Sequence, residues 1–251
     1  MLRGTPLVIM LDIDGTLCDL VERADVAVLP EAVRAALVLL ERRRGDGVHV
    51  ALVTGRSVAD AQRMIGITGI PIHGNHGMER LLEDGTTCGP DGFDVEEARL
   101  HAAAGDLIVL AREFPGTSVE DKRFSLSVHF RGMNDELVPE FLRRASQIAE
   151  RNGLRSASGK RVVNVLPVIS RNKGDAVRDI LHETGATSST ASILFVGDDV
   201  TDEDAFVALR PIPGAVTARV GEPTTQSAAR YSLDDTRAVR ELLQTLVNPR
   251  T

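Results

Sequence analysis

The stretch Leu7-Val8-Ile9-Met10-Leu11, followed at once by Asp12-Ile13-Asp14-Gly15-Thr16-Leu17, decides the fold. Five apolar residues bounded by polar ones predict a short strand buried on both faces, as in a parallel sheet. Asp12 and Asp14 then appear where this strand leaves the sheet, which is the edge where open parallel sheets bind ligands. Two carboxylates that flank one residue can serve one reacting centre as nucleophile and proton donor. The alternative is a surface turn with two solvated aspartates.

Strand and helix patterns alternate before residue 78 and again after residue 167. Pro30 suits the first turn of a helix, and Ser57 can cap the helix that follows it. Such alternation predicts an α/β fold with a doubly wound, Rossmann-like parallel sheet. We expect further strands at 48–53, 70–72, 192–196 and 215–220, and helices at 29–44, 58–65, 173–183, 203–209 and 235–247.

In the middle of the chain the expected helices and strands do not alternate one by one. Its pattern predicts a helix at 94–113, strands at 117–121 and 125–130, a second helix at 136–151, and a hairpin of strands 154–157 and 161–166. This order is a compact α+β unit of its own. The sequence therefore predicts a core formed by residues 1–77 and 168–251, with an α+β cap domain inserted at 78–167.

Composition limits the kind of partner. The 251 residues are 43% hydrophobic and 26% charged, and carry a formal net charge of −7. An acidic chain argues against binding to nucleic acid or to an anionic membrane, and no apolar run has the length of a membrane span. The two cysteines, Cys18 and Cys88, indicate no disulfide framework. We expect a reduced, cytoplasmic protein, a monomer, whose partner is a small anionic molecule.

A second acidic stretch follows the apolar residues 193–196. Asp198, Asp199, Asp202, Glu203 and Asp204 are five acids within seven positions. They would repel one another without a cation, and oxygen ligands of this kind suit Mg²⁺. The alternative is an acidic first turn that complements a helix dipole, which applies best to the last three. For Asp198 and Asp199 we predict metal binding.

Lys173 stands in the first turn of its predicted helix, where the dipole disfavours a cation. A lysine there is explained if it faces an anion, such as a phosphoryl group or the paired aspartates. Thr54 ends the second strand and can offer its hydroxyl and backbone N–H to a phosphate oxygen. Thr54-Gly55-Arg56 alone is a weak motif, and Arg56 could equally form a salt bridge.

Four elements now stand in order: Asp-x-Asp-Gly-Thr at 12–16, Thr-Gly-Arg at 54–56, Asn-Lys-Gly at 172–174, and Gly-Asp-Asp at 197–199. Their order resembles the haloacid-dehalogenase-like (HAD-like) phosphohydrolases from Leu7 to about Phe206. A closer likeness is to trehalose-6-phosphate phosphatases. It rests on segments of both the core and the insertion, namely 74–77, 119–122, 128–131, 158–160 and 197–203.

The resemblance implies a Mg²⁺-dependent phosphatase that hydrolyses trehalose 6-phosphate to trehalose and phosphate through an aspartyl-phosphate. Asp12 would be the nucleophile and Asp14 the acid and base, while Thr54 and Lys173 would hold the transferred phosphoryl group. The metal set would be Asp12, Asp14 and Asp198, with support from Asp199 and Asp202. The implied substrate-binding residues are Gly55, Arg56, Asn75, His76, Glu120, Lys122, His129, Arg131, Lys160 and Asn164.

The sequence departs from the family at one place. Where the family commonly has Glu-Val-Arg-Pro, this chain has Asn164-Val165-Leu166-Pro167. In the family the glutamate helps to hold the sugar, so we expect weaker selectivity for trehalose 6-phosphate unless a neighbour such as Glu120 supplies the carboxylate.

Three other functions remain open. A phosphatase of a related phosphorylated disaccharide or pseudo-disaccharide, of the glycosylglycerate or validoxylamine type, would share the core residues. A sugar phosphomutase would share the aspartates and the metal but would need a bisphosphate activator. A non-catalytic sugar-phosphate sensor would be expected to lose a core residue, and none is lost.

Overall fold

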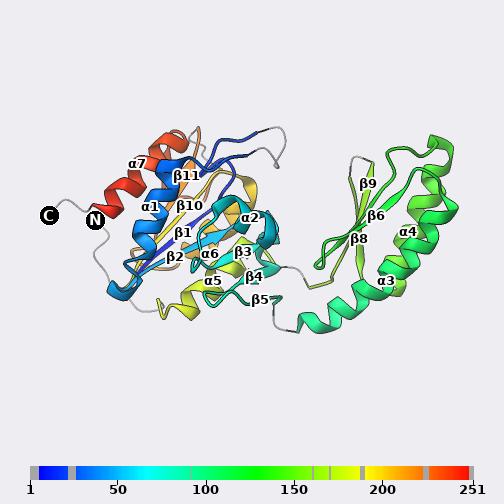
Figure 1. The fold of residues 1–251 in the computed structure, drawn as a ribbon, viewed down its shortest axis with the longest axis horizontal. Helices are drawn as coiled ribbons and strands as arrows, with labels where there is room; N and C mark the ends of the chain where they lie inside the picture. The colour runs from blue at the N-terminus through cyan, green and yellow to red at the C-terminus, as the bar shows by residue number, and fades with distance from the viewer. Residues whose placement is uncertain are drawn as a thin grey trace. The chain divides into compact units, whose positions relative to one another are not determined.

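The protein is described here by a computed structural model that covers residues 6–21, 27–90, 92–159, 161–169, 171–186, 190–222 and 226–248. The chain forms two compact units, one of residues 1–88 and 171–251 and the other of residues 89–170 (Figure 1). Among the described residues, no helix combines the length and the apolar character needed to cross a membrane.

The larger unit is built on an eight-stranded sheet with the order β12-β11-β10-β1-β2-β3-β4-β5. The six strands from β12 to β3 run parallel, and β4 and β5 are antiparallel to their neighbours. The strands are β1 (Leu7–Leu11), β2 (Val48–Val53), β3 (Ile72–Gly74), β4 (Glu79–Leu81), β5 (Thr87–Cys88), β10 (Ser192–Gly197), β11 (Val216–Val220) and β12 (Tyr231–Leu233).

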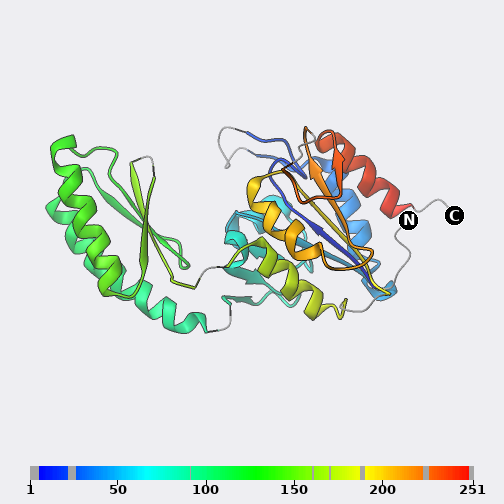
Figure 2. The same cartoon turned by 180° about the vertical axis from the view of Figure 1, so that it is seen from behind.

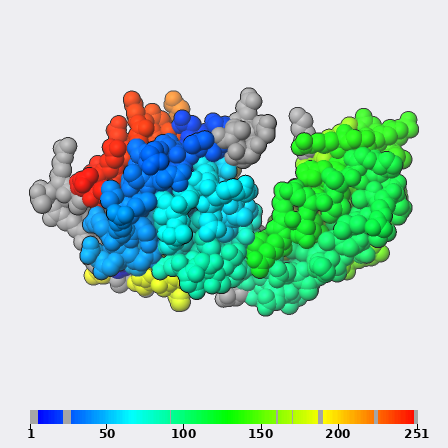
Figure 3. All heavy atoms as spheres, viewed as in Figure 1, coloured from blue at the N-terminus to red at the C-terminus, as the bar shows by residue number. Residues whose placement is uncertain are grey.

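Helices cover both faces of this sheet, which confirms the predicted doubly wound α/β fold (Figures 1 and 2). One face packs against α1 (Glu31–Glu41), α2 (Val58–Ile65) and α7 (Thr236–Val247). The other face packs against α5 (Lys173–Glu183) and α6 (Glu203–Leu209). The last helix, α7, lies beside α1, as the neighbouring red and blue surfaces of Figure 3 show.

Strand β1 is apolar throughout because both of its faces are buried. Ile9 and Leu11 belong to the core cluster on the side of α1, and Val8 and Met10 to the cluster on the side of α5. All four have no exposed surface, and burial of each such side chain contributes roughly 1.5–3 kcal/mol. This burial fixes the position of the strand end that carries Asp12.

The smaller unit is a four-stranded antiparallel sheet with two helices on one face (Figure 2). Its elements are α3 (Phe93–Glu113), β6 (Ser118–Asp121), β7 (Leu126–His129), α4 (Val138–Arg151), β8 (Arg155–Gly159) and β9 (Val162–Leu166), and the strand order is β6-β7-β9-β8. Alternate residues such as Leu126, Val128, Val163 and Val165 are buried. Their neighbours along the strands point to the opposite face.

The predicted boundary at residue 78 differs from the structure. Residues 79–88 form the hairpin of β4 and β5, which extends the large sheet beside β3. These strands have only three and two residues, too few for an alternating pattern to be visible in the sequence. The three-residue strand β12 was missed for the same reason. The second unit accordingly starts at residue 89 and ends at residue 170.

A buried histidine makes the larger unit sensitive to acid. His73 of β3 is 1% exposed, and among the described residues its Nδ1 atom has no hydrogen-bond partner. Burial, with help from Arg80 and Arg171, lowers the pKa of His73 from 6.5 to about 3. Between pH 6.5 and pH 3 the unfolded chain therefore binds a proton that the folded chain does not bind, and stability falls as the pH falls.

We expect His73→Gln to remove this contribution, which is at most about 1.4 kcal/mol per pH unit. The free energy of unfolding, measured by urea denaturation between pH 7 and pH 4, should fall less steeply in His73→Gln than in the wild type. His101→Gln, at an exposed site on α3, is the matched control and should keep the wild-type slope. Equal slopes for His73→Gln and wild type would show that His73 does not couple folding to protons.

Candidate active site

The first set of site residues lies where the connections of the large sheet diverge. From β1 the chain proceeds to β2 and β3 on one side, whereas β10 leads to β11 and β12 on the other. Asp12 follows β1 and Asp198 follows the adjacent β10, and the Asp12 amide donates to the Val196 carbonyl at 3.0 Å. Ligands of doubly wound sheets bind at such a switch point, outside the carboxyl ends of the strands.

Lys173 forms the centre of a buried charge cluster. Its side chain is 2% exposed, and its Nζ donates to Asp12 Oδ1 and to Asp202 Oδ1, both at 2.8 Å. Burial disfavours the ammonium, but the two carboxylates outweigh burial and the pKa of Lys173 is raised. The lysine starts α5 after the capping box of Asn172 and Asp175, which aims the first turn of the helix at the strand ends.

Three carboxylates of this cluster can hold a cation. One oxygen from each of Asp12, Asp198 and Asp202 lies within 4.8 Å of the others. Burial, together with the charge of Asp202, raises the pKa of Asp12 to about 8 and that of Asp198 to about 6, with Lys173 opposing both shifts. A bound divalent cation would keep these carboxylates ionised at neutral pH, and an all-oxygen donor set suits Mg²⁺.

The individual aspartates differ in what they contact. Asp202 is fully buried, and its Oδ2 accepts from the backbone N–H groups of Asp198 and Asp199, both at 3.0 Å. Together with the Lys173 contact, these bonds occupy both Asp202 oxygens, so Asp202 shapes the loop that carries Asp198. Asp199 is exposed and accepts from the Val200 amide at 2.6 Å.

Gly15 and Thr16 were singled out in the sequence only as parts of a motif. Gly15 has φ +74°, and a Cβ atom there would lie 2.1 Å from Asp198 Oδ2, so only glycine lets this carboxylate approach the loop. Thr16 is fully buried, and its Oγ1 lies 3.4 Å from Asp198 Oδ1. Thr16 orients Asp198, a role that no sequence signal other than the motif could have revealed.

Asp14 is held by Arg56, which thus forms the salt bridge that the sequence left open as an alternative to substrate binding. Arg56 donates from Nε to Asp14 Oδ2 and from a second guanidinium nitrogen to Asp14 Oδ1, both at 2.6 Å. The Arg56 side chain is 10% exposed and that of Asp14 is 31% exposed. The hydrogen bond to Asp14 is the largest cause of a raised pKa of Arg56. This two-point contact fixes the Asp14 carboxylate at the solvent side of the site.

Thr54 and His76 also border this edge of the sheet. Thr54 is 1% exposed, and its Oγ1 accepts from the Arg56 amide at 3.2 Å. His76 packs against Gly55 so closely that a Cβ atom on Gly55 would lie 2.6 Å from the His76 ring. Burial, and then the charge of Lys173, lowers the pKa of His76, so this imidazole is neutral at neutral pH.

The remaining predicted residues belong to the smaller unit. Glu120 Oε2 lies 3.0 Å from His129 Nε2 and 3.5 Å from Lys122 Nζ, and this contact with His129 is the main cause of a lowered pKa of Glu120. Asn164 accepts from Ser127 Oγ at 2.8 Å. Arg131 is exposed in the turn after β7. Lys160 lies outside the described residues.

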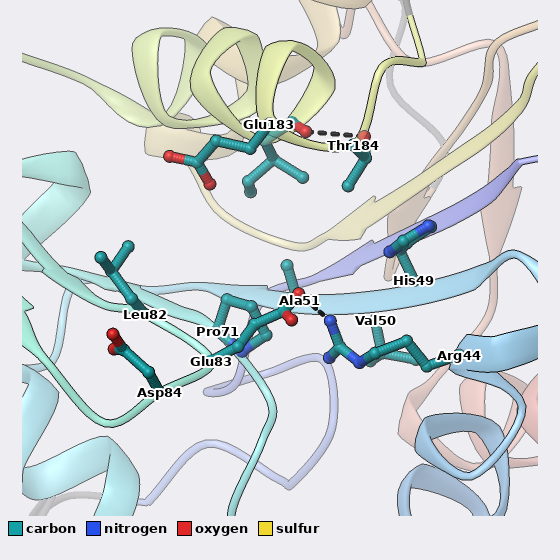
Figure 4. A pocket seen from close by; sticks show the side chains of 11 residues that line it. Arg44, His49, Val50, Ala51, Pro71, Leu82, Glu83, Asp84, Glu183 and Thr184 are labelled. Carbon is teal, nitrogen blue, oxygen red and sulfur yellow. Dashed lines mark hydrogen bonds and ion pairs between the residues drawn. The ribbon is translucent and has the colours of Figure 1, made fainter.

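A pocket in the larger unit lies away from these residues. It has a volume of about 400 Å³ and is lined by the start of β2, the β4–β5 hairpin and the end of α5 (Figure 4). Three of its charged side chains form ion pairs, Arg44 with Glu83, and Glu183 with Arg80. The pocket is at the amino ends of the strands, so it is not the candidate active site.

Known proteins share both the sequence and the fold. A Trehalose-phosphate phosphatase from Mycobacterium leprae is 34% identical over 249 residues, which are 95% of this chain and 57% of that protein. A Mycobacterium tuberculosis protein described as an uncharacterized glycosyl hydrolase is 32% identical over 250 residues, 98% of this chain but 18% of that protein. The chain thus spans only part of the length of these relatives.

A solved structure of a trehalose-6-phosphate phosphatase related protein superimposes with a TM-score of 0.70 at 24% identity and covers 96% of each chain. The family model described as Trehalose-phosphatase matches residues 10–237, which include every site residue discussed above. This chain therefore belongs to the trehalose-phosphatase family.

Proposed function

We propose that this protein is a phosphatase that releases inorganic phosphate from trehalose 6-phosphate. The observation that carries the proposal is the contact of Lys173 with Asp12, directly beside Asp198 and Asp14, at the switch point of the sheet. The relatives named as trehalose-phosphate phosphatases support the substrate. A related phosphorylated disaccharide is the second candidate, because Asn164 and Leu166 stand where the family commonly has a glutamate and an arginine.

In the proposed reaction an Asp12 carboxylate oxygen attacks phosphorus and the bond from phosphorus to the sugar oxygen breaks. Asp14 gives its proton to the departing oxygen and then takes a proton from the water that hydrolyses the aspartyl-phosphate. Arg56 holds Asp14 as a carboxylate ready for the second transfer, and for the first transfer Asp14 gives up one of its two Arg56 hydrogen bonds and takes its proton from solvent. The ammonium of Lys173 and the hydroxyl of Thr54 stabilise the negative charge on the phosphoryl oxygens.

We assign the metal site to Asp12, the Asp14 carbonyl and Asp198, with Asp199 and Asp202 supporting the loop. Mg²⁺ bound there would supply Lewis-acid stabilisation of the phosphoryl oxygens. The pKa values of Asp12 and Asp198, raised mainly by burial, support a cation at this place, since each carboxylate must otherwise bind a proton or remain a costly buried charge.

We propose that the smaller unit is the cap that selects the sugar. Glu120, Ser127 and Asn164 are direct cross-strand neighbours on β6, β7 and β9, on the face that the helices leave open. Neighbours in one row of a sheet point to the same side. The row therefore places a carboxylate and an amide on one side of the sheet, groups suited to sugar hydroxyls, while the buried Ser127 hydroxyl donates to the Asn164 amide oxygen. Gly55, Asn75, His76, Lys122, His129, Arg131 and Lys160 complete the proposed substrate-binding residues.

The test is phosphate release from a panel of sugar phosphates, with Mg²⁺ and with EDTA. We expect trehalose 6-phosphate to be hydrolysed with Mg²⁺ and without a bisphosphate activator, and EDTA to abolish turnover until Mg²⁺ is restored. Calcium should inhibit, because its longer bonds and looser geometry misplace the reacting groups.

Each other outcome identifies a rival function. Faster turnover of another glycosyl phosphate would assign the second candidate. A requirement for a bisphosphate would indicate a mutase, and saturable sugar-phosphate binding without turnover would indicate a sensor. Full activity in EDTA would contradict the proposed metal.

A further inference from the structure

A carboxylate that no sequence motif marked lies beneath the loop that carries Thr54 and Arg56. Glu79, the first residue of β4, is 8% exposed. Its Oε2 accepts from the Val58 amide at 2.8 Å and from Asn75 Nδ2 at 2.9 Å. Val58 is the first residue of α2, so Glu79 also places a negative charge at the positive end of that helix.

The turn that Glu79 contacts is strained. Asn75 and His76 have φ angles of +48° and +57°, in the left-handed region that L-residues other than glycine seldom adopt. Such conformations persist only where surrounding contacts enforce them. The bond from Asn75 Nδ2 to Glu79 is one contact of this kind.

Backbone hydrogen bonds connect the strained turn at Asn75 and His76 to the loop 54–57. The Asn75 amide donates to the Arg56 carbonyl at 2.7 Å, and the His76 amide donates to the Thr54 carbonyl at 3.0 Å. The two backbones approach so closely that a Cβ atom on Gly74 would lie 2.8 Å from the Arg56 carbonyl oxygen. Backbone hydrogen bonds thus join two segments that carry proposed site residues. Glu79 bonds to Asn75 in one of them and to Val58, the residue directly after the loop 54–57.

We propose that Glu79 is a positioning residue for the phosphoryl-binding loop 54–57. Its carboxylate fixes the turn at Asn75 from one side and the start of α2 from the other, and so sets where the Thr54 hydroxyl and the Arg56 guanidinium lie. It touches neither the substrate nor the reacting atoms. The proposal rests on the phosphatase activity proposed above, because that activity gives Thr54 and Arg56 their roles.

The test compares Glu79→Ala and Glu79→Gln with wild type at a temperature where circular dichroism shows all of them folded. A displacement of about 1 Å at a catalytic group can lower the rate by about 100-fold. We expect kcat of Glu79→Ala to fall by roughly 10- to 100-fold while KM changes little, since the affected contacts act in the transition state. Glu79→Gln retains one acceptor oxygen and should recover part of kcat.

Asn75→Gly is the second variant. Glycine accepts the positive φ but removes the Nδ2 donor, so it should lower kcat even if Glu79→Ala folds poorly. The double variant Glu79→Ala with Asn75→Gly should lose less than the product of the single losses, because both break one contact. The control is Glu41→Gln, which removes a carboxylate that pairs with Arg44 in the same unit and should leave kcat unchanged.

Orthovanadate affinity, measured by calorimetry with Mg²⁺ present, separates this inference from the proposed function because it needs no turnover. Weaker vanadate binding in Glu79→Ala and Asn75→Gly than in wild type and Glu41→Gln supports the positioning role even if no sugar phosphate is hydrolysed. If the wild type is active and both variants match it in kcat and in vanadate affinity, the inference is wrong and the phosphatase assignment stands. Loss of thermal stability alone, with normal kcat, would equally overturn it.

Discussion

Asp12→Asn is expected to lower phosphate release by at least about 10⁴-fold with every substrate, because an amide oxygen is a poor nucleophile and the covalent route is lost. The fold should survive. The side chain of Asp12 is almost fully buried, Asn fills the same space, and Lys173 keeps its second carboxylate partner, Asp202. Released phosphate and the thermal midpoint are the two measurements.

Asp204→Asn is the matched control for this change. Asp204 is an exposed acid of the acidic stretch 198–204 and lies outside the proposed metal and catalytic residues. Asp204→Asn replaces a carboxylate by an amide, as Asp12→Asn does, and should keep wild-type kcat. If Asp12→Asn retained more than a few per cent of wild-type activity while Asp204→Asn behaved as expected, Asp12 would not be the nucleophile.

Lys173→Met should damage both activity and stability. It removes a preorganised donor to the phosphoryl group, for which losses of about 10²–10³-fold in kcat are typical. It also leaves Asp12 and Asp202 buried without their ammonium partner, and breaking a buried ion pair in this way costs about 3–5 kcal/mol. Mg²⁺ should restore part of the stability because it neutralises Asp12, one of these two carboxylates.

Arg178→Met provides the comparison for Lys173→Met. It removes a cation from the same helix, where the exposed pair with Asp175 contributes little. Kinetics with saturating Mg²⁺ and urea denaturation with and without Mg²⁺ measure the two effects. A Lys173→Met protein with wild-type stability in EDTA would contradict the buried charge cluster.

The strongest local patterns predicted the fold well. The apolar run of β1, the Ser57 cap of α2 and the bounds of α5 agree with the structure, since each depends on residues close together in the chain. The hairpin of β4 and β5 did not leave such a pattern, so the predicted insertion began at residue 78 instead of residue 89. Strands of two or three residues acquire their structure from a neighbouring strand, which a local pattern does not contain.

The sequence marked candidate residues of the site but did not predict most of their contacts. Lys173 stood out because a cation in a first helical turn needs an anion nearby, and the structure puts it against Asp12 and Asp202. The partner of Arg56 could not be chosen from the sequence, because Asp14 is 42 residues away. Glu79 gave no signal at all, since its role depends on an amide 21 residues before it.

The central claim is that the Asp12 carboxylate becomes phosphorylated during turnover. The most direct test uses Asp14→Asn with an aryl phosphate, whose leaving group needs no proton, so that the first step proceeds and hydrolysis of the intermediate is slow. After an acid quench and proteolysis, mass spectrometry should find one added phosphoryl group on the peptide that contains Asp12, and none in the double variant Asp12→Asn with Asp14→Asn. Phosphate release by Asp14→Asn without any phosphorylated Asp12 peptide, or a phosphoryl group on another residue, would contradict the account.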